Sequence, residues 1–217
     1  MIRKYQVRCK HRTPMLHHWD NIEWADRMMA WQKVPANKAA SKAGDDRTPP
    51  WRWFGSLYRN FDRVAWPVDN LMSALMRGGA KTPTGKGTGT FKSQTQSGII
   101  PTEPYCRFTN HGKEIVVTNL LREIEALSWE AQNALVADLG FMLDVRRVKI
   151  GKARHIRVRP RFDEWEIETT LSVTDDAISR DVLTLIGEQT GQYVGLGDWR
   201  PGSPTPGSWG MFSFEVE

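Results

Sequence analysis

RRVKIGKARHIRVRPR at residues 146–161 and WEIETTLSV at residues 165–173 are the stretches that decide the fold. In the first, branched apolar residues alternate with His155, Arg157 and Arg159, which predicts a strand with cations along one face. In the second, apolar residues alternate with glutamates and small polar residues, which predicts a half-buried strand with an acidic outer face. Successive strands of this kind indicate a sheet with one face in the core and the other in solvent.

The rest of the chain mixes predicted strands with predicted helices. Both ends are predicted strands, because residues 2–10 alternate with a basic outer face and residues 212–216 alternate apolar with polar. Apolar residues at helical spacing predict helices after a cap at Asp20, from Val68 to Gly79 and over residues 179–190. A cap at Ser128 and the stop signal of Gly140 predict a helix to about Leu139. Short strands are predicted at residues 51–54, 64–66 and 115–117. This mixture predicts an α+β fold, with an antiparallel sheet covered by helices.

Two segments lack such periodicity. Residues 33–50 combine lysines with Ala, Gly, Asp and paired prolines, and residues 81–98, KTPTGKGTGTFKSQTQSG, contain almost no apolar side chain. A loop this long inside a compact domain is usually functional or disordered. We therefore expect one domain over residues 1–217, with insertions at about 33–50 and 81–104.

The charge of the chain is unevenly distributed. The net charge is +5, but only two of the 30 basic residues follow Arg161, against 11 of the 25 acidic residues. Such a chain can attract a polyanion on one surface and associate head to tail with copies of itself. Two cysteines cannot form a disulfide framework, which favours a cytoplasmic protein. No stretch approaches the ~20 apolar residues of a membrane span, so we expect no membrane partner.

The basic stretch is the strongest candidate for a binding site. Residues on one face of a strand lie ~6.5–7 Å apart, close to the phosphate spacing of an extended single strand. Arginine adds planar donors for phosphate and a flat face for base stacking. The predicted phosphate contacts are Arg146, Arg147, Lys149, Lys152, Arg154, Arg157 and Arg159. The alternative is structural, with the glutamates of residues 164–168 paired to these arginines across a hairpin.

Two glycine-rich loops extend this candidate site. In GKGTGTFK, residues 85–92, backbone amides, hydroxyls, Lys86 and Lys92 could hold phosphates, although the spacing is neither that of a P-loop nor that of a dinucleotide fingerprint. In residues 195–210, Arg200 is one of two basic residues in the acidic C-terminal part. We expect Lys86 and Lys92 from the first loop, and Arg200 from the second, to clamp a bound strand.

The signals for catalysis and metal binding are weaker. Cys9, His11, His17 and His18 lack the spacing of a zinc site, and no GxSxG or Cys–His pattern specifies a nucleophile. The acidic pair Asp45-Asp46 could hold a divalent ion for phosphodiester cleavage, so a metal-dependent nuclease is a third hypothesis. We expect no catalytic residue, no bound metal and no cofactor.

Three stretches resemble the RAMP superfamily, the RNA-binding proteins that form the backbone of CRISPR effector complexes. They are YQVRCKHRTPML (5–16), a strand entering a proline turn, AWPVDNLMSALMRGG (65–79), a strand-then-helix segment, and GLGDWRPGSPTPGSWGMFSF (195–214), a glycine-rich loop before a final strand. The resemblance implies a ferredoxin-like (RRM-type) sheet with insertions, in which residues 81–98 match a thumb-like insertion laid across guide RNA. It does not separate a subunit of such a complex from a stand-alone homologue of a phage or mobile element.

The leading hypothesis is a non-catalytic protein that binds single-stranded nucleic acid, RNA before DNA, and polymerises along it. The aromatic RNP pattern of RNA-recognition sheets does not occur in the sequence, so binding is expected through loops and charge, largely independent of base sequence. The second hypothesis is a structural or protein-interaction component, such as a viral assembly protein or an inhibitor.

Overall fold

The structure, a computed structural model, describes residues 1–41 and 44–217. The chain divides into two compact units, where the sequence predicted one domain. The sheet unit contains Met1–Met15, Ala65–Glu114 and Asp163–Glu217, and the hairpin unit contains Leu16–Val64 and Ile115–Phe162. Residues 42–43, inside the insertion predicted at 33–50, lie outside the described residues. No helix in the described part of the chain has the length and apolar character needed to cross a membrane.

The sheet unit is built on an antiparallel sheet with the order β10-β1-β9-β6-β4, and β5 pairs with the end of β9 beyond β6. Its strands are β1 (Arg3–His11), β4 (Arg63–Pro67), β5 (Ile99–Pro101), β6 (Tyr105–Asn110), β9 (Trp165–Val173) and β10 (Phe212–Val216). Its helices are α3 (Val68–Gly79), α4 (Lys92–Gly98) and α7 (Arg180–Tyr193). The α+β class and the mainly antiparallel sheet predicted from the sequence are confirmed.

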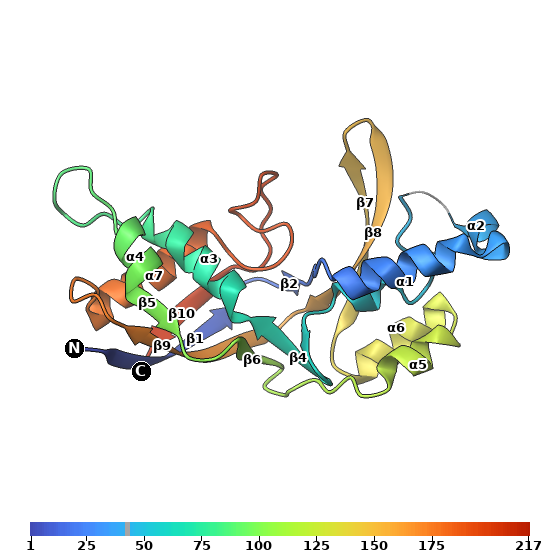
Figure 1. Ribbon diagram of the computed structural model, residues 1–217, viewed down its shortest axis with the longest axis horizontal. Helices are drawn as coiled ribbons and strands as arrows, with labels where there is room; N and C mark the ends of the chain where they lie inside the picture. Colours follow the sequence, from blue (N-terminus) through green and yellow to red (C-terminus); the bar gives the residue numbers. More distant parts are fainter. Residues whose placement is uncertain (42–43) are drawn as a thin grey trace. The chain divides into compact units, whose positions relative to one another are not determined.

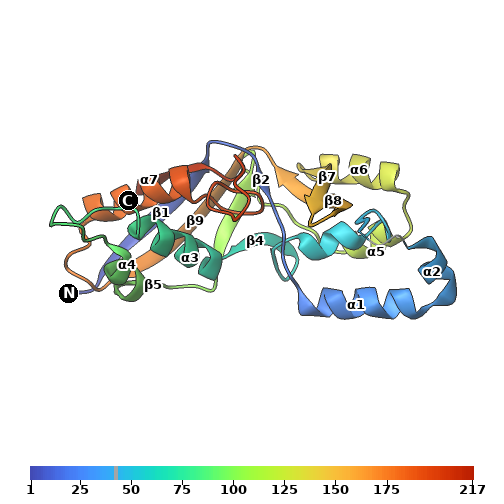
Figure 2. The same cartoon turned by 90° about the horizontal axis from the view of Figure 1, so that it is seen from above.

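One face of this sheet carries the core of the unit. Cys9 of β1 lies between Ile167 of β9 and Phe214 of β10, and all three side chains are buried. Helix α7 packs closely on this face, because a Cβ atom added to Gly187 would lie 2.0 Å from the Phe214 ring. Figure 1 shows α3, α4 and α7 on one side of the sheet, and Figure 2 shows α3 beside α7. The polar positions of the same strands form the opposite face.

The helix boundaries follow the capping residues of the sequence in most cases. The hydroxyls of Ser179 and Ser128 accept hydrogen bonds from Val182 N and Ala131 N, so the N-cap predicted at Ser128 is confirmed and Ser179 caps α7. The first helix is capped by the side chain of Asn21, so the predicted cap at Asp20 is wrong by one residue.

The hairpin unit combines short helices with a long β-hairpin. Its helices are α1 (Ile22–Lys33), α2 (Pro35–Ala40), α5 (Leu120–Glu125), α6 (Trp129–Asp138) and the 3₁₀ helix η1 (Arg52–Ser56). Its strands are β3 (Arg59–Asn60), which pairs with the start of β4, and β7 (Met142–Ile150) and β8 (Ala153–Phe162), which form the hairpin. The short strand β2 (Met15–Leu16) pairs with β8, giving the order β2-β8-β7.

Aromatic side chains fill the core of the hairpin unit. Phe141 stacks on Phe162 with ring centroids 5.3 Å apart, and the Trp53 ring contacts Phe141 at 6.0 Å. The indole Nε1 of Trp53 donates a 2.7 Å hydrogen bond to Oε1 of the buried Gln132 on α6. The ring of His17 lies 4.4 Å from that of Phe162. These contacts join η1, α6 and the base of the hairpin into one core.

Several short segments differ from their predictions, because a run of four residues carries little periodicity. Residues 51–54 belong to the turn around η1 and not to a strand, and residues 115–117 make one isolated bridge, Arg63 with Val116. Part of the insertion predicted at 33–50 is helix α2, and part of the one predicted at 81–104 is α4 and β5.

Candidate nucleic-acid interface

The basic stretch of residues 146–161 lies on both strands of the β7–β8 hairpin, which turns at Gly151 and Lys152. The strand predicted from His155, Arg157 and Arg159 is confirmed as β8, but the cations before Gly151 belong to a second strand, β7. Gly151 has a φ angle of +59°, a left-handed conformation that glycine adopts at little cost, so the chain can reverse at this position. In Figure 1 the hairpin extends well past α1 of the same unit.

The register divides the cations of the hairpin between two faces, because directly opposite residues of an antiparallel pair point to the same side. We call the first the inner face, and it carries Arg146, His155, Arg157, Arg159 and Arg161. We call the second the outer face, and it carries Arg147, Lys149 and Arg154.

The inner face is neutralised at the base of the hairpin by Asp46, whose side chain is only 4% exposed. One carboxylate oxygen accepts a hydrogen bond from Arg157 Nη1 and the other from Arg159 Nη1, each at 3.0 Å. Arg52 Nη1 lies 3.3 Å from the same carboxylate. The backbone N–H of Asp46 also donates to Ile156 O at 2.9 Å, which fixes this loop against β8. Charge and backbone contacts thus hold the base of the hairpin together.

Further along the inner face, the remaining groups also have contacts within the protein. Arg146 Nη2 donates to Asp144 at 2.9 Å, and this hydrogen bond raises the pKa of Arg146. His155 packs on the backbone at Gly44, where an added Cβ atom would lie 2.3 Å from the imidazole Nδ1. The face that the sequence singled out for its cations therefore packs mainly against the hairpin unit itself.

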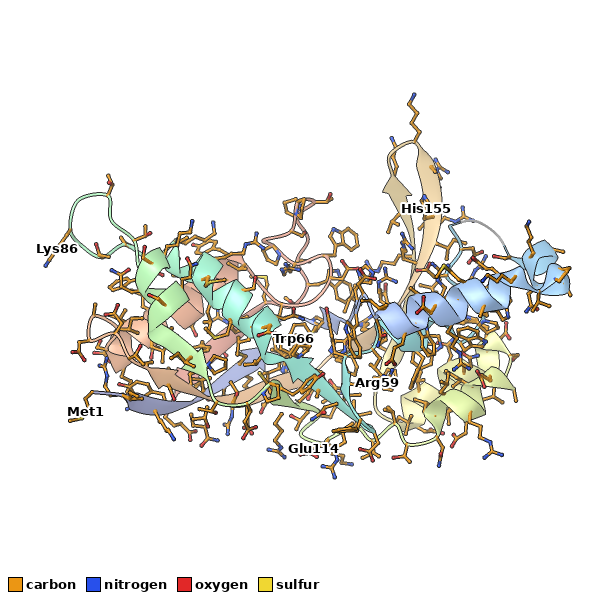
Figure 3. The ribbon with its side chains drawn as sticks, in the orientation of Figure 1. Met1, Arg59, Trp66, Lys86, Glu114 and His155 are labelled. Atoms are coloured by element: carbon orange, nitrogen blue, oxygen red, sulfur yellow. The ribbon has the colours of Figure 1, made fainter. Side chains whose placement is uncertain are left out.

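The tip of the hairpin is different. Arg147, Lys149, Lys152 and Arg154 are all exposed, and none of them forms an ion pair with a carboxylate of the described residues. Lys149 and Arg154 are directly opposite each other, and Arg147 lies two residues from Lys149 on the outer face. We call these four residues the tip cations. They concentrate positive charge on a narrow protruding element (Figure 3).

The other three predicted cations belong to the sheet unit. Lys86 is exposed on the loop before α4, between Gly85 and Gly87, and points away from the rest of its unit in Figure 3. Lys92 is exposed at the first residue of α4. Arg200 is half-buried in the C-terminal loop, where its Nη1 donates to Gly197 O at 2.7 Å. The predicted phosphate contacts between Arg146 and Arg159 therefore share one hairpin, whereas Lys86, Lys92 and Arg200 belong to the other unit.

The acidic strand β9 does not pair with the basic hairpin. It lies between β1 and β6, and Glu168 accepts hydrogen bonds from Arg8 Nε at 2.7 Å and from Arg107 Nη1 at 3.0 Å. Burial opposes the ionised form of Glu168, but these hydrogen bonds outweigh it and lower its pKa. Lys10 lies 3.9 Å from Glu166. The structural alternative, in which these glutamates neutralise the basic stretch, is thus wrong, and they neutralise the open face of the sheet.

The candidate metal ligands do not form a metal site in the described residues. The described residues contain no group of three or more His, Cys, Asp or Glu side chains placed to hold a metal ion. Burial lowers the pKa of His17 to about 3, and its Nδ1 accepts a hydrogen bond from Tyr58 N at 3.3 Å. Asp45 pairs with Arg47 at 2.7 Å. Burial raises the pKa of both thiols, Cys9 and Cys106.

No protein-family model and no curated protein matches this chain. The resemblance to RAMP proteins therefore stays a prediction.

The hairpin unit also contains a cavity of about 340 Å³ that the sequence did not indicate. Trp19, Trp24, Arg52, Arg157 and the acids Asp20 and Asp46 are among its lining residues. These residues come from three distant segments, and none of the segments has a local pattern that marks a site. The sequence predicted Arg157 and Arg159 of this lining as phosphate contacts and Asp46 as a possible metal ligand, but it did not indicate that they share a cavity.

Proposed function

We propose that this protein binds single-stranded nucleic acid, with RNA as the expected partner, through the tip of the β7–β8 hairpin. The observation that supports this proposal is the set of four tip cations, exposed and unpaired with any carboxylate of the described residues. Arg159 is buried against Asp46, so we assign it to the structure of the hairpin and give the first phosphate contacts to the tip.

The spacing of the tip cations suits a phosphate chain. Arg147 and Lys149 are two residues apart on one strand face, which separates them by ~6.5–7 Å. Lys149 and Arg154 are cross-strand neighbours, with Cβ atoms ~5 Å apart. Like charges this close repel one another, so a bound polyanion relieves a cost that the free protein bears. Phosphates supply that counter-charge and release their own counterions on binding.

The topology of the sheet unit supports the ferredoxin-like fold that we include in the proposal. The elements β1, α3, β5–β6, β9, α7 and β10 follow one another as two interleaved βαβ motifs, with β4 added at the edge. RRM-type sheets of this class read bases with aromatic residues on the open face. Here that face carries Arg8, Glu168 and Arg107 in a chain of ion pairs, which favours the hairpin as the binding element.

The test is a salt titration of binding to a labelled oligouridine, followed by fluorescence anisotropy. The test variant replaces all four tip cations by glutamine. Each phosphate contact contributes ~0.7 to the slope of log K against log salt for a single strand, so losing four contacts should reduce that slope by about 3. The control variant removes the same charge by replacing four other exposed cations, Lys33, Lys38, Lys113 and Arg122.

The control should keep the wild-type slope, because loss of net charge alone removes no direct contact. Equal slopes for the test variant and the wild type would show that the tip does not contact phosphate. Light scattering with and without oligonucleotide separates this function from a protein-interaction role. Head-to-tail assembly along a strand requires the oligonucleotide, whereas assembly that ignores it favours a structural component.

A further inference from the structure

We propose that the cavity in the hairpin unit receives one nucleotide of the bound strand, with its base among the tryptophans and its phosphodiester on Arg52 and Arg157. This inference rests on the function proposed above and assigns to it a site for a base. The cavity measures about 340 Å³, within the ~300–1,000 Å³ range of small-molecule sites.

The wall formed by β8 and η1 carries more positive than negative charge. The guanidinium groups of Arg52, Arg157 and Arg159 surround the single carboxylate of Asp46. The side chains of Arg52 and Arg157 are 33% and 29% exposed, and each contacts Asp46 through Nη1. A guanidinium has five N–H donors, so both residues can donate to a second anion while they hold the first.

The net charge of the lining indicates which phosphate fits. With Asp20 at the cavity as well, two carboxylates face three guanidinium groups, which leaves one positive charge. A phosphodiester inside a strand carries one negative charge, whereas a terminal phosphate monoester carries about 1.5–2 at pH 7. The cavity is therefore balanced for an internal nucleotide, and a free nucleotide brings excess negative charge close to Asp20 and Asp46.

The indoles at the cavity are held by packing. Trp24 Nε1 donates to Arg52 O at 3.0 Å, and its ring contacts the edge of Trp51 at 5.4 Å. Trp19 stacks with Tyr58, with centroids 6.0 Å apart and an interplanar angle of 27°. Both Trp19 and Trp24 are half-buried, so they present fixed aromatic surface. Stacking on such surface tolerates any base, in agreement with binding that ignores sequence.

The cavity and the tip cations share strand β8. Arg154 at the tip and Arg157 at the cavity are three residues apart, roughly 10 Å along the strand. They lie on opposite faces of the hairpin, so a strand that contacts both must cross its edge. An extended strand bound at the tip therefore has a neighbouring nucleotide within reach of the cavity.

The experiment compares two labelled strands of equal length, an oligouridine and a strand of abasic sites with the same phosphates. Trp19→Ala should weaken oligouridine about tenfold, since stacking contributes ~1–3 kcal/mol per base, and should leave the abasic strand within about twofold. Arg52→Gln should weaken both strands. Trp129→Ala is the matched control, because Trp129 is a half-buried tryptophan of the same unit outside the cavity lining. Trp19→Phe retains a ring and should recover most of the affinity, which separates stacking from loss of folding.

The outcomes separate failure of the proposed function from failure of the cavity assignment. If wild-type protein binds neither strand, the proposed function fails. If it binds oligouridine and the tip variant lowers the salt slope, but Trp19→Ala changes nothing, the function stands and the cavity assignment is overturned. Equal weakening of both strands by Trp19→Ala also overturns it, because the effect is then unrelated to bases. Free uridine 5′-monophosphate should displace the labelled oligouridine only at a concentration far above that required of unlabelled oligouridine. Displacement at a concentration below that of the unlabelled strand would assign the cavity to a free nucleotide.

Discussion

Replacing Asp46 by asparagine should loosen the β7–β8 hairpin at its base. The change keeps the size of the side chain and removes the charge that three arginines share. Arg159 is only 7% exposed, so the change removes a carboxylate partner from a buried charge, and breaking such a pair costs ~3–5 kcal/mol. Arg52 and Arg157 are about a third exposed, and solvent screens most of their loss. We therefore expect a cost of about 3 kcal/mol, mainly from Arg159.

The measurement is hydrogen exchange by mass spectrometry on peptides from β7 and β8. A loss of about 3 kcal/mol accelerates exchange through local opening by roughly a hundredfold. The control is Asp62→Asn, because Asp62 is an exposed acid of the same unit whose oxygen accepts from Thr118, and the amide can keep that bond. Adding Arg159→Met to Asp46→Asn should recover part of the stability, since it removes the buried positive charge that Asp46 no longer balances. Unchanged exchange in Asp46→Asn would refute the role given to this carboxylate.

Three further predictions concern the cores of the two units. The free energy of unfolding should fall by ~1.4 kcal/mol for each unit that the pH is lowered between 6.5 and 4.5. The reason is that His17 takes up a proton in the unfolded chain, whereas in the native protein its pKa of about 3 keeps it neutral. Urea titrations of His17→Gln should lack this dependence on pH. Gly191→Ala should cost about 2 kcal/mol in thermal unfolding, because the new Cβ would lie 2.0 Å from the backbone oxygen of Phe212; a neutral result would mean that α7 packs less closely. Cys9 and Cys106 should react with a thiol reagent at pH 8 only after urea is added, since burial raises the pKa of both thiols, and fast reaction of folded protein would contradict their burial.

The features that local patterns control could be predicted from the sequence. Helices α3 and α7 follow apolar residues at helical spacing, and α6 follows its predicted cap at Ser128. The alternation in β1, β9 and β10 identifies their buried faces, because one side of each strand packs in the core. The division into two units could not be predicted, since the chain passes between them four times and no composition shift marks the crossings.

The candidate site shows a stricter limit, because a sequence reveals where cations are but not which of them have partners. Both faces of the hairpin are basic, and alternation alone treats Arg157 like Arg154. What separates them is Asp46, 111 residues before Arg157, which pairs with Arg157 at the base of the hairpin, whereas Arg154 lies exposed at the tip. In the sequence this aspartate looks like half of a metal-binding pair. A buried carboxylate must find cations, and a basic strand must either find carboxylates or stay in solvent. Asp46 therefore holds Arg159 in the base of the hairpin, while the tip cations stay available to a polyanion.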